Sequence, residues 1–107
     1  MKDEQPGDET PEIIINAGIQ SIYPNPFNPQ TTISYYLEES ADVTVEIFNT
    51  KGQKIRSLNE GSKEADAKHS LIWNGQNSNS ENVGSGIYFF KLKAGNLVET
   101  KQAILLK

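Results

Sequence analysis

The stretch that decides the fold is Tyr23-Pro24-Asn25-Pro26-Phe27-Asn28-Pro29, which we call the proline segment. Each of its prolines fixes φ, lacks an N–H group and biases the preceding residue toward extended geometry. The segment is therefore predicted to be neither helix nor central strand, but a stiff, extended lead-in whose asparagines suit local turns. No proline follows Pro29 in the chain. We therefore expect the proline segment to mark where a folded all-β module with uninterrupted strands begins.

The residues after the proline segment alternate between apolar and polar side chains. Residues 31–37 and 42–48 show this period of two most clearly, and the period is typical of half-buried strands. Strands are expected over residues 19–23, 31–37, 42–48, 54–58, 69–73, 87–93 and 97–107. About seven strands, with turn signals roughly every 8–12 residues, predict a β-sandwich.

The segments between these strands carry weaker signals. Residues 49–52 are expected to form a hairpin turn with Gly52 at positive φ. A β-bulge is expected within residues 54–58, because their apolar side chains break the alternation. Residues 59–68 are polar and charged, which indicates a surface loop, with a short helix as the alternative over residues 63–68. Residues 13–15, three isoleucines, are interpreted either as a short strand or as the apolar end of a linker.

The acidity of the chain is concentrated at its N-terminus. The net charge is −4, and residues 1–12 account for it, because they hold five acids and one lysine. Residues 13–107 hold nine acids and nine bases. Residues 1–18 are therefore expected to be an acidic, flexible linker and residues 19–107 the sandwich domain. A neutral folded part provides no basic field for nucleic acid or anionic lipid, so neither partner is expected.

Composition excludes several further classes of protein. The chain has no cysteine, so neither disulfides nor thiolate metal sites are expected. No apolar run approaches the ~20 residues of a membrane-spanning helix, and no apolar stretch of a signal peptide follows Met1. We therefore expect no direct membrane insertion, and we expect the chain to be a piece of a longer protein.

Three blocks of sequence, taken together, resemble one family. The first is YPNPFNP at residues 23–29, followed by TTISYYL at 31–37. The second is DVTVEIFNTKGQKIRSL at 42–58. The third combines HSLIWNG at 69–75, VGSGIYFFKLKAGN at 83–96 and ETKQAILLK at 99–107. In this order they resemble the type A C-terminal sorting domain of the bacterial type IX secretion system, which is similar to the immunoglobulin-like domain of flagellar hook-capping proteins. The match spans roughly residues 19–107.

The resemblance implies a fold, a function and a set of partners. The fold would be an immunoglobulin-like antiparallel β-sandwich at the C-terminus of a secreted enzyme or adhesin, covalently continuous with that upstream cargo. The outer-membrane type IX translocon would recognise the domain after Sec export to the periplasm. A surface sortase-like protease would then remove it, cutting upstream of Ile19, and the cargo would be attached to lipopolysaccharide. The expected location is thus the periplasm in transit, then the outer-membrane surface or the medium.

The resemblance also places the sorting signal in the last hairpin, about residues 86–107. The candidate residues there are Gly86, Tyr88, Lys91, Gly95, Lys101, Leu105, Leu106 and Lys107. A plainer interpretation is that residues 97–107 simply close a sheet, since each apolar residue at 104–106 would contribute roughly 1.5–3 kcal/mol if buried. We expect both roles to hold, with a structural strand whose terminal edge is recognised by the export machinery.

No catalytic, cofactor or metal site is expected. His69 is the only histidine and lies beside Ser70 with Asp66 nearby, but no G-x-S-x-G context supports a catalytic triad. The family often has acids after the tryptophan, whereas residues 74–77 here read Asn-Gly-Gln-Asn. Carboxylate ligands for calcium are therefore scarce in this loop.

Two other functions remain open beside sorting. One is a structural or assembly module of the flagellar hook-cap kind, which only packs against partners. The other is an accessory carbohydrate-binding module with an aromatic platform, although core and cross-strand packing explain the aromatic residues more simply. Those aromatic residues are Tyr23, Tyr35, Tyr36, Trp73, Tyr88, Phe89 and Phe90.

Overall fold

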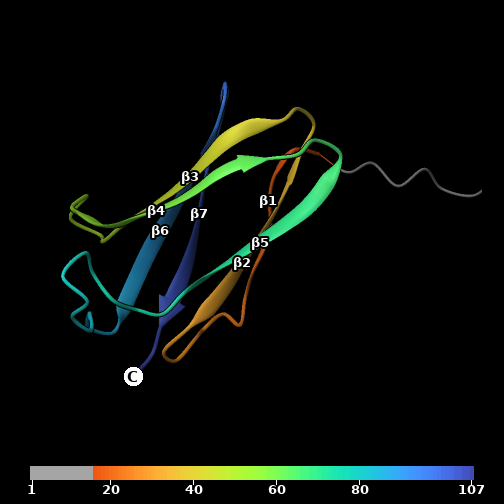
Figure 1. Cartoon of the computed structure of the whole chain (residues 1–107). Helices are drawn as coiled ribbons and strands as arrows, with labels where there is room; N and C mark the ends of the chain where they lie inside the picture. The colour runs from red at the N-terminus through yellow and green to blue at the C-terminus, as the bar shows by residue number, and fades with distance from the viewer. Residues whose placement is uncertain (1–15) are drawn as a thin grey trace, which may run out of the picture.

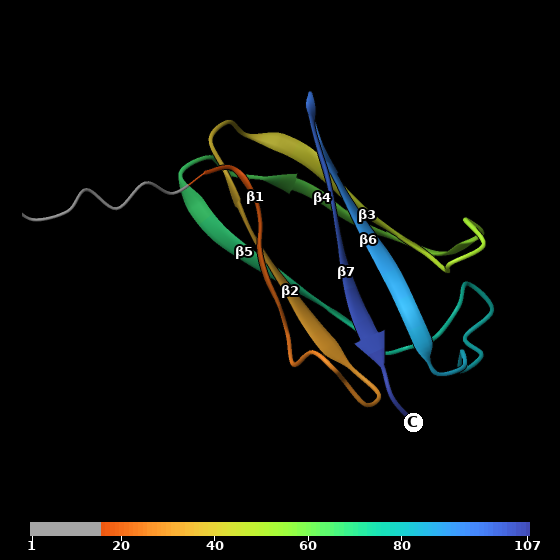
Figure 2. The ribbon, with the colours of Figure 1, turned by 180° about the vertical axis from the view of Figure 1, so that it is seen from behind.

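Seven antiparallel strands make up the computed structural model, which describes residues 16–107 (Figure 1). They are β1 (Gly18–Tyr23), β2 (Thr31–Leu37), β3 (Ala41–Phe48), β4 (Lys54–Lys63), β5 (Ala67–Trp73), β6 (Gly86–Ala94) and β7 (Leu97–Leu105). One sheet has the strand order β1-β2-β5 and the other the order β4-β3-β6-β7. The two sheets form the two layers seen in Figures 1 and 2. The expected immunoglobulin-like antiparallel β-sandwich of about seven strands is confirmed. Residues 16–107 contain no helix long and apolar enough to cross a membrane.

The core lies between the sheets and is built from the side chains that the period of two points inward. In β2 every second residue is buried, while the residues between are half-buried. Leu71 and Trp73 of β5 are buried on one face, with Ile72 exposed between them. The largest fully buried apolar side chains are Trp73, Tyr35, Phe27, Phe90, Ile33, Leu37, Ile47, Leu92, Leu105, Val43 and Val45. Burying each contributes about 1.5–3 kcal/mol, so this cluster is the main stabilising element.

The surface loop expected at residues 59–68 is confined to residues 64–66, and the alternative of a short helix at 63–68 is wrong. β4 continues to Lys63, opposite Ala41 of β3. Edge strands tolerate polar side chains and irregular register, and β4 is such a strand, with Gly61 at φ 74°. A polar run therefore did not indicate a loop. The bulge expected near Ile55 is confirmed by a register shift of β4 against β3. The prediction for residues 13–15 lies outside the described residues.

The proline segment is a connection inside the fold rather than its beginning. β1 precedes it and pairs with β2 from Gly18 opposite Tyr36 to Tyr23 opposite Thr32. β1 thus starts one residue before the strand expected at 19–23. The segment links β1 to β2 and passes beside the end of β7 (Figure 2). The expectation that it marks the start of the module is corrected accordingly, because a strand can form before a proline run as well as after it.

The hydroxyl group of Tyr35 is buried and has no hydrogen-bond partner within the described residues. An unpaired buried polar group costs about 1–3 kcal/mol. We therefore expect Tyr35→Phe to leave the free energy of unfolding at neutral pH unchanged or to raise it by about 1 kcal/mol. Urea unfolding measures this change. Tyr36→Phe is the control, since the Tyr36 hydroxyl donates to Asp66 Oδ1 at 3.2 Å on the exposed side. Destabilisation by Tyr35→Phe would contradict the prediction.

The same variant is expected to alter stability at alkaline pH. Burial, with the charge of Glu60 as the second cause, raises the pKa of Tyr35 from 10.0 to about 12. The unfolded chain loses the Tyr35 proton near pH 10.0 while the folded chain keeps it up to about 12, so stability falls as the pH rises across this window. Tyr35→Phe should remove that part of the fall, measured by urea unfolding at a series of pH values. An unchanged alkaline slope would count against the shifted pKa.

Candidate functional site: the terminal hairpin and the proline segment

β6 and β7 form a hairpin at one edge of the four-stranded sheet. They pair along their whole length, from Gly86 opposite Leu105 to Ala94 opposite Leu97. Gly95 turns the chain between them with φ 60°, a conformation that glycine adopts without steric cost. Because side chains alternate across a strand, one face of the hairpin belongs to the core and the other is the outer surface of the sheet.

The proline segment is bonded to the free edge of β7, near its end. The Phe27 N–H donates to the Ile104 carbonyl at 2.8 Å, and the Leu106 N–H donates to the Phe27 carbonyl at 3.0 Å. The Ile104 N–H donates to Asn25 Oδ1 at 2.9 Å. These three bonds occupy backbone groups that an edge strand would otherwise offer to another chain. The proline segment and the end of β7, which belong to the first and third blocks of the family resemblance, are therefore in direct contact.

Phe27 anchors this contact in the core. Its exposed fraction is 2%, although both neighbours in the chain, Pro26 and Asn28, are exposed. The Phe27 ring lies 5.9 Å from the ring of Trp73 and 6.5 Å from that of Phe90, centre to centre, in tilted or edge-on geometry. Such aromatic pairs add about 0.5–1.5 kcal/mol beyond the area they bury. The proline segment is thus held from both sides, by β7 through its backbone and by the core through one side chain.

Gly75 allows the far end of the proline segment to approach the loop after β5. Gly75 has φ 76°, and a Cβ atom there would lie 2.7 Å from the backbone oxygen of Pro29. Gly52 has a similar φ of 81°, but a Cβ atom there would meet nothing within 4 Å. The two glycines therefore share the conformational constraint, and only Gly75 has a close neighbour.

This pair gives a matched test of how firmly the proline segment is seated. Gly52→Ala and Gly75→Ala should each lose about 1–2 kcal/mol for the left-handed conformation. Gly75→Ala should lose about 1–3 kcal/mol more, because the new methyl group overlaps the Pro29 carbonyl. Chemical denaturation of the two variants measures the difference. Equal losses would mean that the segment moves aside freely.

Tyr88 connects the hairpin to the long loop at residues 74–85. Its hydroxyl donates to the Gly84 carbonyl at 2.7 Å, and its ring lies 5.3 Å from that of Trp73. The Trp73 Nε1–H in turn donates to the Gln76 carbonyl at 2.9 Å. Burial raises the pKa of Tyr88 above 10.0, so the hydroxyl remains a protonated donor at physiological pH. These bonds make Tyr88 a structural link rather than a surface group.

The candidate sorting residues do not form one cluster. Gly95 lies at the turn of the hairpin, at the opposite end of the strands from Leu105, Leu106 and Lys107. Gly95, Lys101, Leu106 and Lys107 are exposed, Gly86 and Lys91 are half-buried, and Tyr88 and Leu105 are buried. The Lys107 N–H is fixed by the Ser85 Oγ at 2.9 Å. A partner of the folded domain can therefore contact the exposed candidates directly. Tyr88 and Leu105 are buried, so they can influence recognition only by stabilising the fold.

The other candidate sites, His69 and the aromatic residues, lie mostly outside the terminal hairpin. The His69 Nε2 lies 2.8 Å from the Glu64 carbonyl, and its ring lies 5.4 Å from that of Tyr35. Among residues 16–107 no group of three or more His, Asp or Glu residues is placed to hold a metal ion. Of the seven aromatic residues that would build a platform, only Tyr23 is largely exposed, at 76%. Core packing accounts for the four buried ones, Tyr35, Trp73, Tyr88 and Phe90, while Tyr36 and Phe89 are half-buried on opposite sheets.

Sequence reasoning missed the contact between the proline segment and β7. The bonded residues, such as Asn25 and Ile104, are separated by 79 positions, and no local pattern connects them. The only indication was that both stretches belong to one family resemblance. The burial of Phe27 was missed as well, because a lone aromatic residue between prolines carries no periodicity.

The fold and the hairpin place the molecule among immunoglobulin-like β-sandwich domains, and a family model narrows the class. The model described as "secretion system C-terminal sorting domain" matches residues 21–106. The chain belongs to this family, and the resemblance seen in its sequence is confirmed. It is a sorting domain of type IX secretion, a kind of domain exported through the periplasm to the cell surface or beyond. Such domains are generally non-catalytic.

Solved structures with this fold include three bacterial proteins. FlgD from P. aeruginosa is 24% identical, with a TM-score of 0.58 over 70% of this chain and 58% of that one. Dimeric latent PorU from Porphyromonas gingivalis is 17% identical, with a TM-score of 0.68 over 82% of this chain and 9% of that one. PorZ is a surface component of the type IX secretion system of the same species. It is 19% identical, with a TM-score of 0.60 over 84% of this chain and 12% of the PorZ chain.

These identities show similarity of fold. The chain spans 58% of the FlgD chain and only 9% and 12% of the PorU and PorZ chains. A search of curated protein sequences finds no significant match.

Proposed function

We propose that this chain is the non-catalytic sorting domain of a larger exported protein and that the outer-membrane type IX translocon recognises its terminal hairpin. In this proposal residues 1–18 are a linker to the cargo and residues 19–107 are the signal-bearing sandwich. A surface sortase-like protease then separates the two upstream of Ile19. The exposed candidates Lys101, Leu106 and Lys107 contact the machinery, while Tyr88 and Leu105 hold the hairpin in shape.

The observation that carries the proposal is the joining of the proline segment and the last strand, two parts of the family pattern, into one structural unit. Three hydrogen bonds join the proline segment to the end of β7. The Phe27 side chain, in the middle of the segment, is buried in the core. The last strand is therefore held in a defined conformation while several of its side chains remain exposed. A sorting signal that is recognised in the folded state needs this combination, because a mobile strand would lose entropy on binding.

The test is a fusion of a signal peptide, a reporter enzyme and the full chain, expressed in a bacterium with the type IX pathway. We expect the reporter to appear on the cell surface or in the medium. The same fusion in a strain lacking the translocon, and a reporter without the chain, serve as controls and should remain periplasmic. A reporter that stays in the periplasm of the competent strain, attached to a folded domain, would refute the proposal.

The likeness to FlgD shows the fold alone and does not favour an assembly function over sorting. Exposure of Tyr23 without a second exposed aromatic side chain beside it does not favour a carbohydrate platform either.

A further inference from the structure

Charge is unevenly divided between the terminal hairpin and the rest of the described chain. Residues 86–107 carry four lysines and one glutamate, whereas residues 16–85 carry five bases and eight acids. The single acid of the hairpin, Glu99, faces β1, where its Oε1 accepts the Ile19 N–H. The neutral folded part expected from composition is therefore a cationic hairpin joined to an acidic remainder.

The outer face of the four-stranded sheet combines this charge with an apolar patch. Phe48 lies opposite Phe89, and Ile87 lies opposite Ile104, on neighbouring strands. Ile87, Ile104 and Leu106 are exposed to 38%, 37% and 53%. We call the group Phe48, Ile87, Phe89, Ile104 and Leu106 the outer patch. Isolated apolar residues are normal at a surface, but a contiguous patch with a polar rim indicates an interaction site.

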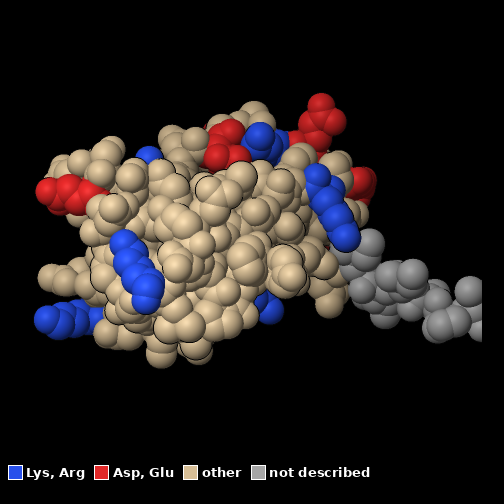
Figure 3. Space-filling view, turned by 90° about the horizontal axis from the view of Figure 1, so that it is seen from below, with Lys and Arg blue, Asp and Glu red and all other residues tan. Residues whose placement is uncertain are grey.

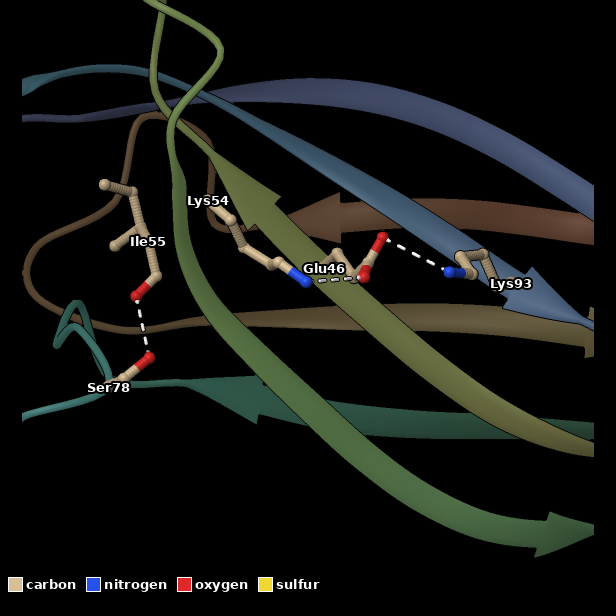
Figure 4. A network of polar contacts seen from close by, with 5 residues as sticks. All are labelled: Glu46, Lys54, Ile55, Ser78 and Lys93. Carbon is tan, nitrogen blue, oxygen red and sulfur yellow. Dashed lines mark hydrogen bonds and ion pairs between the residues drawn. The ribbon is translucent and has the colours of Figure 1, made fainter.

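Lysines border the outer patch, and its one nearby acid is already neutralised. Lys54 lies opposite Phe48, and Lys91 follows Phe89 on the same face. Glu46, between them, accepts from Lys54 at 3.1 Å and lies 3.6 Å from Lys93 (Figure 4). The hydrogen bond from Lys54 is the main cause that lowers the pKa of Glu46. The three lysines and Glu46 therefore leave a net positive rim.

The end of the sandwich at which the chain finishes is largely uncharged. Figure 3, seen from below the view of Figure 1, shows a broad area without acidic side chains, with acids along its upper edge and lysine or arginine at several points on and around it. The outer patch reaches this end through Leu106, which directly follows β7. A partner approaching here meets a largely uncharged surface that includes Leu106.

We propose that the outer patch and its lysine rim are the surface by which this domain docks on an acidic protein surface with an apolar centre. The inference rests on the proposed sorting function and names the surface that the export machinery recognises. Interfaces of this kind place apolar side chains at the centre and complementary charges around them. A lipid surface fits less well, because anionic membranes are bound by clusters of four to eight basic residues, whereas the rim has three lysines with Glu46 paired to two of them.

The test compares matched positions on the two outer faces. Ile87→Ser combined with Ile104→Ser removes the centre of the outer patch, and Ile72→Ser is the control on the other sheet, where Ile72 is 56% exposed. In the reporter fusion of the full chain, the double variant is expected to lower export about tenfold. The control should remain within about twofold of wild type. Urea unfolding of the purified chains verifies that each variant folds.

Charge variants keep the proposal testable if the double serine variant fails to fold. Lys91→Glu should lower export about tenfold and Lys91→Arg should retain it, since the partner is acidic. Urea unfolding verifies that Lys91→Glu folds, because the new carboxylate would lie opposite Glu46. Lys68→Glu on the other sheet should have no effect. Normal export of Lys91→Glu or of a folded double serine variant overturns the docking surface alone. A wild-type fusion that stays periplasmic overturns the sorting function and the docking surface together.

The nature of the partner is tested with vesicles of phosphatidylcholine, with and without phosphatidylglycerol. The purified chain is expected to bind neither. Binding to the phosphatidylglycerol vesicles that disappears in Lys91→Glu would overturn the protein partner in favour of anionic lipid.

Discussion

Phe27→Ala is expected to lower the free energy of unfolding by about 3–5 kcal/mol, because it leaves a cavity between Trp73 and Phe90. A small domain is stabilised by only about 5–15 kcal/mol in total, so the variant should lose much of its stability. The side chain is 2% exposed and contacts both rings. Equilibrium denaturation of the purified chain measures the change.

Tyr23→Ala is the control for Phe27→Ala, since Tyr23 is also an aromatic residue of the proline segment but is 76% exposed. It should change the free energy of unfolding by less than about 1 kcal/mol. Hydrogen exchange adds a local measurement: the Leu106 amide, bonded to the Phe27 carbonyl, should exchange faster in Phe27→Ala than in Tyr23→Ala. Equal stability of the two variants would mean that the proline segment does not anchor the last strand.

Leu105→Ala is expected to lower the free energy of unfolding by about 2–5 kcal/mol, as a large-to-small change in the core. Leu106→Ala should lower it by less than about 1 kcal/mol. The two leucines are neighbours, but Leu105 is 0% exposed and Leu106 is 53% exposed. Denaturation of the two purified variants separates the contribution of the last strand to the fold from its exposed surface.

The same pair separates stability from recognition in the reporter fusion. Leu106→Ala, which stays folded, should reduce export several-fold if the exposed end of the hairpin contacts the machinery. Leu105→Ala should reduce export only in proportion to its loss of folded protein, so a second stabilising change elsewhere should restore it. If Leu106→Ala is exported normally while Leu105→Ala is not rescued by stabilisation, the last strand is recognised through its buried face or in an unfolded state.

The strands were predictable where the local pattern is strong. The alternation over residues 31–37 gave the bounds of β2 without error, and Gly52 and Gly95 turn with positive φ. The end of β4 was not predictable, because its polar residues are tolerated at an edge strand and indicate a loop when taken alone. The residues of the terminal hairpin were named from the resemblance, but their division into buried and exposed groups came from the packing of β6 and β7.

The sequence by itself determined the class of fold, most strand positions and the family, because the period of two, the prolines and the turn glycines act on their own neighbourhood in the chain. Only the tertiary structure decided that the proline segment covers the edge of β7, that Phe27 is a core residue, and that Phe48 joins Ile87 and Ile104 on one face. Phe48 and its partner Phe89 are 41 positions apart, and Asn25 and Ile104 are 79 apart. These contacts depend on which strands pair and how two sheets pack, and no local pattern records that choice.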